Sequence, residues 1–262
     1  MQKSRYVFVA ALLAIVLLAA SPLAAQPTAT FNLTGVGSRA NLAGVYTSPY
    51  AGKINGGATI PVICDDFSDE SFVPEQWTAY ATSLSSLLSG TANTSVLKWQ
   101  SPFLIGSGAA VAMLSQTEAY SAAALLAIDI LTSTGIAQEE YSFAMWDLFD
   151  PGAFALLTSH GFVPYETVAQ NFLNIAVNEA STGNMTSGSS VSSYLSNYNV
   201  TIYSYNGKGT WCGGGYCPPP PQEFITVSVA EPPSPALLGV DLLGLAGLVL
   251  FARRRGWLAR EI

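Results

Sequence analysis

The residues best suited to chemistry gather around one cysteine. Cys64 ends a β-branched, apolar run and is followed by four acids, in the stretch VICDDFSDES at 62–71. A thiol acts as a nucleophile when a neighbouring base activates it, and carboxylate oxygens are the ligands that calcium prefers. A lone cysteine is more often a small buried side chain. The sequence favours this last role, as a core residue of a strand.

The catalytic role requires a base, and the chain has one histidine, His160. With Asp65 or Asp150 as the orienting carboxylate, Cys64 and His160 would form a Cys–His hydrolase. No family signature surrounds either residue, so the hydrolase is an alternative interpretation. Calcium binding is another, because the acidic run offers oxygen ligands, although its D-D-x-x-D-E spacing at 65–70 differs from the spaced loops of known calcium sites. The favoured interpretation includes no metal and no cofactor.

Two further cysteines, Cys212 and Cys217, bound a glycine-rich loop in the stretch WCGGGYCPPPP. In an exported, oxidising setting such a pair predicts a disulfide. The short ring is possible because glycines adopt the dihedral angles that it requires. The alternative is a pair of zinc ligands, which normally needs two more Cys or His residues.

The surroundings of Cys64 resemble a known family. An apolar residue and a cysteine after a Gly/Tyr-rich strand, with a later helix that carries FAMWDLF at 143–149, look like the thioester domains of bacterial surface adhesins. The resemblance implies that the cysteine bonds to a glutamine four residues before Trp146 and passes the acyl group to an amine or other nucleophile. Ser142 holds that position and has no carboxamide, whereas Gln138 lies one turn earlier on the same helix face. We therefore expect a thioester-like scaffold that has lost the bond, with a covalent adhesin that uses Cys64 and Gln138 as the alternative.

Both ends of the chain carry targeting patterns. Residues 1–25 combine a basic start, an apolar run and small residues, which is typical of a secretory signal peptide. Near the other end, the apolar segment 235–252 is long enough to span a membrane as a helix. Arg253, Arg254 and Arg255 follow directly, and such a cluster stays on the cytoplasmic side.

The C-terminal segment 231–262 resembles the PEP-CTERM sorting signal of Gram-negative bacteria. It has a short motif around Glu231 and Pro232, then the apolar span and then the arginine cluster, although Ala230 replaces the first proline of the usual triplet. The resemblance implies that an exosortase cuts near Glu231 and Pro232 and releases the protein to the cell surface or the exopolysaccharide matrix. The membrane would then hold the chain only transiently. The alternative is a permanent single-span membrane protein.

The exported part, residues 26–230, has a length that suits one domain or two small ones. It contains four basic residues and 14 acidic residues. A nucleic-acid partner is excluded, because a chain this acidic cannot replace the counterions on phosphates.

Strand-like and helix-like patterns follow one another along this exported part. β-branched and aromatic residues punctuated by Gly, Asn and Pro predict strands at 28–67, 199–205 and 222–230. Apolar residues at helical spacing predict helices within 103–134, over 138–149 and over 165–179, with a loop at 181–197. The predicted fold is α+β: an antiparallel β-sheet or sandwich with two or three inserted helices. A signal peptide and a C-terminal membrane span flank it.

These patterns together predict an exported cell-surface or extracellular-matrix protein with a structural or adhesive role and no catalysis. Its expected partners are the exosortase, the secretion machinery and the membrane, and then extracellular polysaccharide or surface proteins. Aromatic side chains could stack on the sugar rings of such a matrix. The tryptophans concerned are Trp77, Trp99, Trp146 and Trp211.

Overall fold

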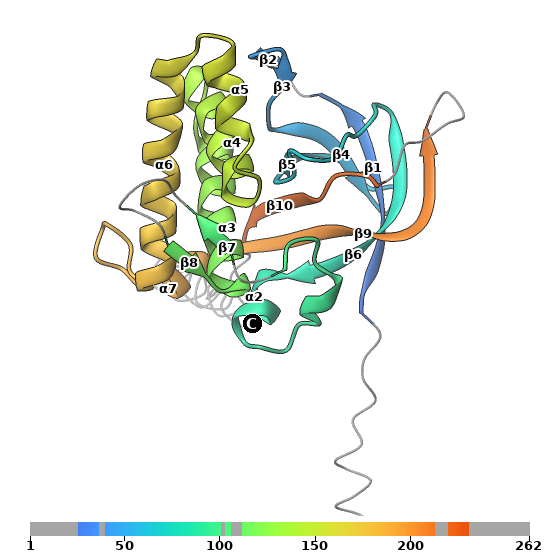
Figure 1. Ribbon diagram of the computed structural model, residues 1–262. Coiled ribbons are helices and arrows are strands. Elements are labelled where there is room, and N and C mark those ends of the chain that lie inside the picture. The colour runs from blue at the N-terminus through green and yellow to red at the C-terminus, as the bar shows by residue number, and fades with distance from the viewer. Residues whose placement is uncertain (1–25, 37–39, 101–102, 106–111, 213–219, 231–262) are drawn as a thin grey trace, which may run out of the picture.

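Figure 1 shows the computed structural model of the chain, which describes residues 26–36, 40–100, 103–105, 112–212 and 220–230. The predicted signal peptide at 1–25 and the predicted sorting tail at 231–262, with its Glu231, Pro232 and arginine cluster, lie outside the described residues. None of the helices in the described ranges is both long enough and apolar enough to cross a membrane.

The described strands include a closed antiparallel barrel, in the order β1-β4-β5-β10-β9-β6. Alternate residues of β1 and β6 point inward, as expected for strands with one buried face. Inside the barrel, the ring of Phe31 lies 4.6 Å from that of Trp77 and 5.1 Å from that of Phe224, centroid to centroid. These rings come from three different strands, so their burial holds the barrel together. The strands are β1 (Thr28–Gly35), β4 (Tyr50–Ile54), β5 (Thr59–Cys64), β6 (Glu75–Ser83), β9 (Tyr198–Cys212) and β10 (Phe224–Val229).

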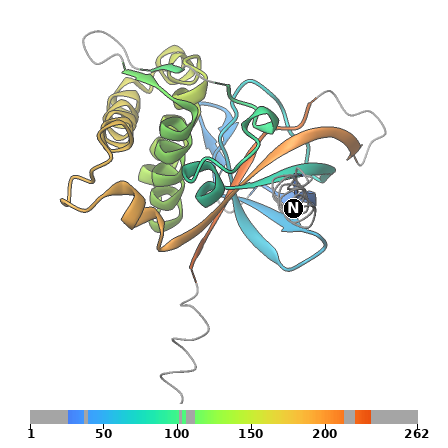
Figure 2. The ribbon, with the colours of Figure 1, turned by 90° about the horizontal axis from the view of Figure 1, so that it is seen from below.

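The long helices stand together beside one side of the barrel (Figures 1 and 2). Helix α3 is buried over most of its surface, because it packs against α4, α6 and β10. A capping box formed by Ser115 and Glu118 fixes its start. Helix α6 ends at Gly183, whose φ of 70° is a left-handed conformation that glycine adopts without strain. The helices are α3 (Gln116–Thr132), α4 (Ile136–Phe149), α5 (Ala153–Ser159) and α6 (Val163–Thr182).

Short elements connect these larger ones. Two small hairpins, β2 with β3 and β7 with β8, lie outside the barrel order. The short elements are β2 (Ala40–Leu42), β3 (Val45–Tyr46), α2 (Leu84–Leu88), η1 (Thr94–Val96), β7 (Phe103–Ile105), β8 (Ala112–Leu114) and α7 (Val191–Leu195).

The structure confirms a mixed fold with antiparallel strands, and it corrects the predicted sheet or sandwich to a closed barrel. Closure results because β6 pairs with β1 on one side and with β9 on the other. The last strand, β10, lies between β5 and β9. These pairings join segments far apart in the sequence, so local patterns of β-forming residues do not reveal them.

Single elements agree with the sequence patterns to different degrees. The helices predicted at 138–149 and 165–179 are present as α4 and α6. The helix predicted within 103–134 begins only at Gln116, because the β7–β8 hairpin precedes it. The loop predicted at 181–197 contains α7. Strand β6 and the short helices α2 and α5 had no predicted counterpart.

Candidate functional site

Cys64 is the last residue of β5 and is fully buried. Its thiol donates to the carbonyl oxygen of Asp66 at 3.1 Å. Its backbone N–H donates to Ser48 Oγ at 3.0 Å, and its carbonyl accepts from Trp146 Nε1 at 3.1 Å. Burial, with added repulsion from Asp66 and Asp65, raises the pKa of the Cys64 thiol well above its usual value. The sulfur is therefore held as a neutral thiol, the less reactive form of cysteine.

The position that the thioester resemblance assigns to a glutamine lies close to this cysteine. The hydroxyl of Ser142 donates to the carbonyl of Gln138 at 2.9 Å and to the carbonyl of Ser48 at 3.4 Å. Ser48 thus accepts hydrogen bonds from both Cys64 and Ser142. The structure brings these two residues to one buried place, but Ser142 offers a hydroxyl where a thioester needs an acyl donor.

Gln138 is used elsewhere. Its carboxamide donates to the carbonyl of Ile130 at 2.7 Å and to that of Ser133 at 3.2 Å. These carbonyls belong to the end of α3, which has no partners for them within the helix. The structure therefore assigns Gln138 to the α3–α4 connection and does not bring its carboxamide to Cys64.

The hydrolase alternative also lacks the geometry it needs. His160 is exposed at the end of α5, where its Nδ1 lies 3.0 Å from the carbonyl of Leu156 and 3.2 Å from Ser159 Oγ. Cys64 is buried beneath α4 at the end of β5. No described contact joins the histidine to the thiol, so a Cys–His pair is not assembled.

The predicted disulfide or zinc pair at Cys212 and Cys217 lies outside what the structure describes. Cys217 falls in the segment 213–219, and Cys212 is the last residue of β9, where it pairs with Glu75 of β6. Within the described residues, no group of three or more His, Cys, Asp or Glu side chains is placed to hold a metal ion. The calcium alternative for the acids after Cys64 therefore has no assembled site.

Asp66 and Asp69 instead share one cation. Lys98 Nζ forms an ion pair with Asp66 and another with Asp69, the latter at 2.6 Å. The second oxygen of Asp66 accepts from the backbone N–H groups of Ser68 at 3.1 Å and Asp69 at 3.2 Å. Asp66 is fully buried, so Lys98 supplies the charge that makes this burial tolerable.

Asp65 and Glu223 form a second buried acid pair. Glu223 accepts from the hydroxyl of Tyr120 at 2.5 Å, from the backbone N–H of Lys98 at 3.0 Å and from the hydroxyl of Ser204. Burial and the adjacent Glu223 charge raise the pKa of Asp65 well above its usual value. Two carboxylates cannot both be charged at such a place, so Asp65 keeps its proton and Glu223 accepts the available hydrogen bonds.

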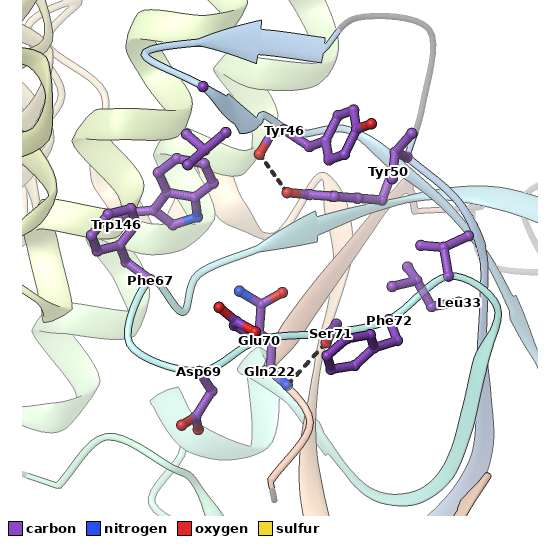
Figure 3. A pocket seen from close by; sticks show the side chains of 14 residues that line it. Leu33, Tyr46, Tyr50, Phe67, Asp69, Glu70, Ser71, Phe72, Trp146 and Gln222 are labelled. Carbon is purple, nitrogen blue, oxygen red and sulfur yellow. Dashed lines mark hydrogen bonds between the residues drawn. The ribbon is translucent and has the colours of Figure 1, made fainter. Parts of the chain in front are cut away.

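A pocket of about 380 Å³ opens on the surface beside Trp146. Figure 3 shows aromatic side chains on its two sides, with the polar side chains of Glu70, Ser71 and Gln222 between them. The lining comes from β1, the β2–β3 hairpin, the start of β4, the connection from β5 to β6, helix α4 and the segment before β10. Its aromatic and charged residues are Tyr46, Tyr50, Phe67, Phe72, Trp146, Asp69 and Glu70.

The rings at the pocket rim are available to a ligand. Tyr46 is 50% exposed and Phe72 is 41% exposed. Tyr50 is buried, and its hydroxyl donates to the carbonyl of Tyr46 at 2.6 Å, which fixes the hairpin above the pocket. Glu70 is exposed, and it forms no ion pair or hydrogen bond with another described residue. The sequence singled out the acids and Trp146 but missed Tyr46, Phe72 and Gln222 as one site, because they come from separate segments.

Comparison with known proteins finds little. No protein-family model matches the chain, and no curated protein matches it. Among solved structures, the chain is similar to the N-terminal domain of the Streptococcus pyogenes pilus tip adhesin Cpa. That similarity covers 79% of this chain and 95% of the other, at 11% sequence identity and a TM-score of 0.40. A likeness this distant supports no conclusion about chemistry or partner.

The burial of Cys64 predicts that its thiol does not react with an alkylating reagent while the protein is folded. In a variant in which Cys212→Ser and Cys217→Ser leave Cys64 as the remaining thiol, iodoacetamide should not modify the native protein within an hour. After unfolding in urea it should add one carbamidomethyl group, because only unfolding exposes the sulfur. Intact mass spectrometry measures both states. Rapid modification of the native protein would contradict the buried, hydrogen-bonded position of Cys64.

The charge on Lys98 should be required for stability. Lys98→Met leaves the buried Asp66 without an opposite charge, and we expect the free energy of unfolding to fall by about 3 kcal/mol or more. Lys53→Met is the matched control, since Lys53 forms no ion pair with a described residue, and it should change stability by less than about 0.5 kcal/mol. Urea unfolding followed by tryptophan fluorescence measures both. Equal effects of the two substitutions would show that the Asp66–Lys98 pair is not needed.

Proposed function

We propose that this protein is exported and acts at the cell surface or in the extracellular matrix, where it binds saccharide chains without a covalent bond. Export rests on the signal-peptide pattern at 1–25 and the PEP-CTERM-like tail at 231–262. The exosortase, the secretion machinery and the membrane are its partners in transit. The adhesive role rests on one observation, the aromatic and acidic pocket beside Trp146.

The surroundings of Cys64 support a non-covalent role. The thiol is buried and hydrogen-bonded, and Cys64 is not among the residues that line the pocket. Trp146 belongs to both places, since its ring lines the pocket while its Nε1 donates to the carbonyl of Cys64. Cys64 is buried and outside the lining, and Trp146 is itself only 2% exposed, so a ligand in the pocket does not reach the thiol. The groups that a thioester or a hydrolase would need do not meet here, because the Gln138 carboxamide bonds to the end of α3 and His160 lies at the end of α5.

The chemistry of the pocket fits a sugar. The apolar faces of pyranose rings pack on aromatic side chains, and Tyr46 and Phe72 present half-exposed rings at the rim. Sugar hydroxyls also need hydrogen-bond acceptors, which Glu70 and the carbonyl oxygen of Gln222 provide. The volume of about 380 Å³ lies within the range of roughly 300–1,000 Å³ that is usual for small-ligand sites.

The pocket can be tested directly. Tyr46→Ala and Phe72→Ala should each weaken retention of the purified, exported protein on its native exopolysaccharide by about tenfold, which corresponds to about 1.4 kcal/mol of stacking. Val229→Ala removes an apolar side chain that is 74% exposed outside the pocket lining, and it should have no effect. Co-sedimentation or biolayer interferometry provides the measurement. If neither aromatic variant differs from the control, saccharide binding does not occur at this pocket.

Sorting has its own test. Replacing Glu231 and Pro232 by alanine should leave a full-length, membrane-held form in cells that otherwise release a shortened protein. Glu261→Ala, in the same tail but outside the motif, is the control and should be processed normally. Immunoblots of membrane and extracellular fractions distinguish the two forms. Normal release of the Glu231→Ala/Pro232→Ala variant would exclude processing at this motif.

A further inference from the structure

We infer that the pocket beside Trp146 selects sugars that carry a free amine over neutral sugars, and that it rejects sugars that carry an acid group. This inference rests on the proposed function and names the chemical class of its ligand. It follows from three features of the pocket: its charge, the hydrogen-bonding groups that remain unused in it, and its aromatic walls.

The charge of the pocket is negative and uncompensated. Asp69 and Glu70 line it, and no lysine, arginine or histidine is among the lining residues. Asp69 shares the ammonium group of Lys98 with Asp66, at 2.6 Å from Asp69. Glu70 has no such partner among the described residues, and Figure 3 shows it between the aromatic sides of the pocket. A bound ammonium group would gain an opposite charge here, whereas a bound carboxylate would be repelled.

The hydrogen-bonding groups that remain unused are mainly acceptors. The amide nitrogen of Gln222 donates to the carbonyl of Asp66 at 2.7 Å, and the indole N–H of Trp146 donates to Cys64. The hydroxyl of Tyr50 is also engaged, on the carbonyl of Tyr46. The two carboxylate oxygens of Glu70 and the side-chain oxygen of Gln222 are left to accept, beside two unused donors, the second N–H of the Gln222 amide and the hydroxyl of Tyr46. An ammonium group has three donors and no acceptor, so it matches this set better than a hydroxyl does and far better than an acid.

The aromatic walls favour the same ligand. A cation near the face of a tyrosine, phenylalanine or tryptophan ring is attracted by the negative face of the ring. Tyr46 and Phe72 offer exposed rings at the rim, and Trp146 and Phe67 lie on the other side, with their ring centroids 5.4 Å apart. The exposed rings of Tyr46 and Phe72 suit a pyranose that carries the amine, because an apolar face of the sugar can pack on an aromatic ring. A lysine side chain carries the same amine but would leave these flat surfaces unfilled.

Three saccharide probes and one peptide test the inference. We expect the glucosamine tetramer to bind the exported protein about tenfold more tightly than the N-acetylglucosamine tetramer, at a pH at which the amine is protonated. A galacturonic acid tetramer should show no binding. The preference for the amine should shrink in 1 M salt, because exposed charge pairs are screened. A lysine-rich peptide should bind more weakly than the glucosamine tetramer. Isothermal titration calorimetry measures all four.

Glu70→Gln separates this inference from the proposed function. The variant keeps the shape of the side chain but loses its charge. It should therefore bind both the glucosamine and the N-acetylglucosamine tetramer with the affinity that the unaltered protein has for the N-acetylglucosamine tetramer, and so lose the tenfold preference. Glu139→Gln, on α4 and outside the pocket lining, should keep the preference. Thermal unfolding of both variants checks that the fold is unchanged.

The outcomes are distinct. If both tetramers bind equally to the unaltered protein, or if Glu70→Gln keeps the preference, the amine inference is wrong while saccharide binding stands. If no saccharide binds but the lysine peptide does, the saccharide function falls together with the inference. Saccharide binding that is about tenfold weaker in Tyr46→Ala, with the amine preference lost only in Glu70→Gln, is the result that supports both.

Discussion

The burial of Glu223 is the constraint on which the rest of this structure depends. A carboxylate without solvent is costly unless donors surround it. Here Tyr120 from α3, Ser204 from β9 and the backbone of Lys98 supply those donors, and a protonated Asp65 lies alongside. One side chain thus fixes the position of the central helix, a barrel strand and a connecting segment at once. Displacing any of them would leave a buried polar group unpaired.

The same constraint shapes the surface around it. Because Asp65 and Asp66 turn inward to Glu223 and Lys98, the chain that follows must turn outward, and it presents Glu70 and Phe72 to solvent. Gln222 holds this turn with two hydrogen bonds. Its side-chain amide donates to the carbonyl of Asp66, and its backbone N–H donates to Ser71 Oγ at 3.2 Å. The lining of the pocket is thus joined to the buried acids by these two hydrogen bonds. The polar residues of the pocket, Glu70, Ser71 and Gln222, lie within a few residues of the buried acids Asp65, Asp66 and Glu223 along the chain.

Local patterns predicted those parts of the molecule that local chemistry determines. The helical spacing of apolar residues predicted α4, and the β-branched run before Cys64 predicted a strand that buries it. The barrel could not be predicted in this way, because its closure depends on the register between β6 and β9. The pocket could not be predicted either, since Tyr46, Phe72 and Gln222 meet only after the barrel has formed.

The resemblance to thioester domains implied that Cys64 lies near the helix that carries Trp146, but it did not predict which bonds form there. The pattern from Cys64 to Trp146 predicted that β5 and α4 would meet, and Trp146 Nε1 does contact the Cys64 carbonyl. Which bonds form there depends on single side chains. With a hydroxyl at Ser142 and the carboxamide of Gln138 at the end of α3, hydrogen bonds to Ser48 replace a covalent link.

The position of β10 has a mechanical consequence. Gln222, just before the strand, lines the pocket, and Ala230, just after it, donates to the carbonyl of Asn197 at 2.8 Å. Tension applied to the chain beyond Ala230 would run along β10 and load its antiparallel pairing with β9, from Phe224 to Val229, in shear. Strands loaded in shear must break many hydrogen bonds together, whereas strands that are peeled apart lose them one at a time. Before the tail is cut, a ligand in the pocket and a pull on the tail would thus act at opposite ends of one strand that resists stretching.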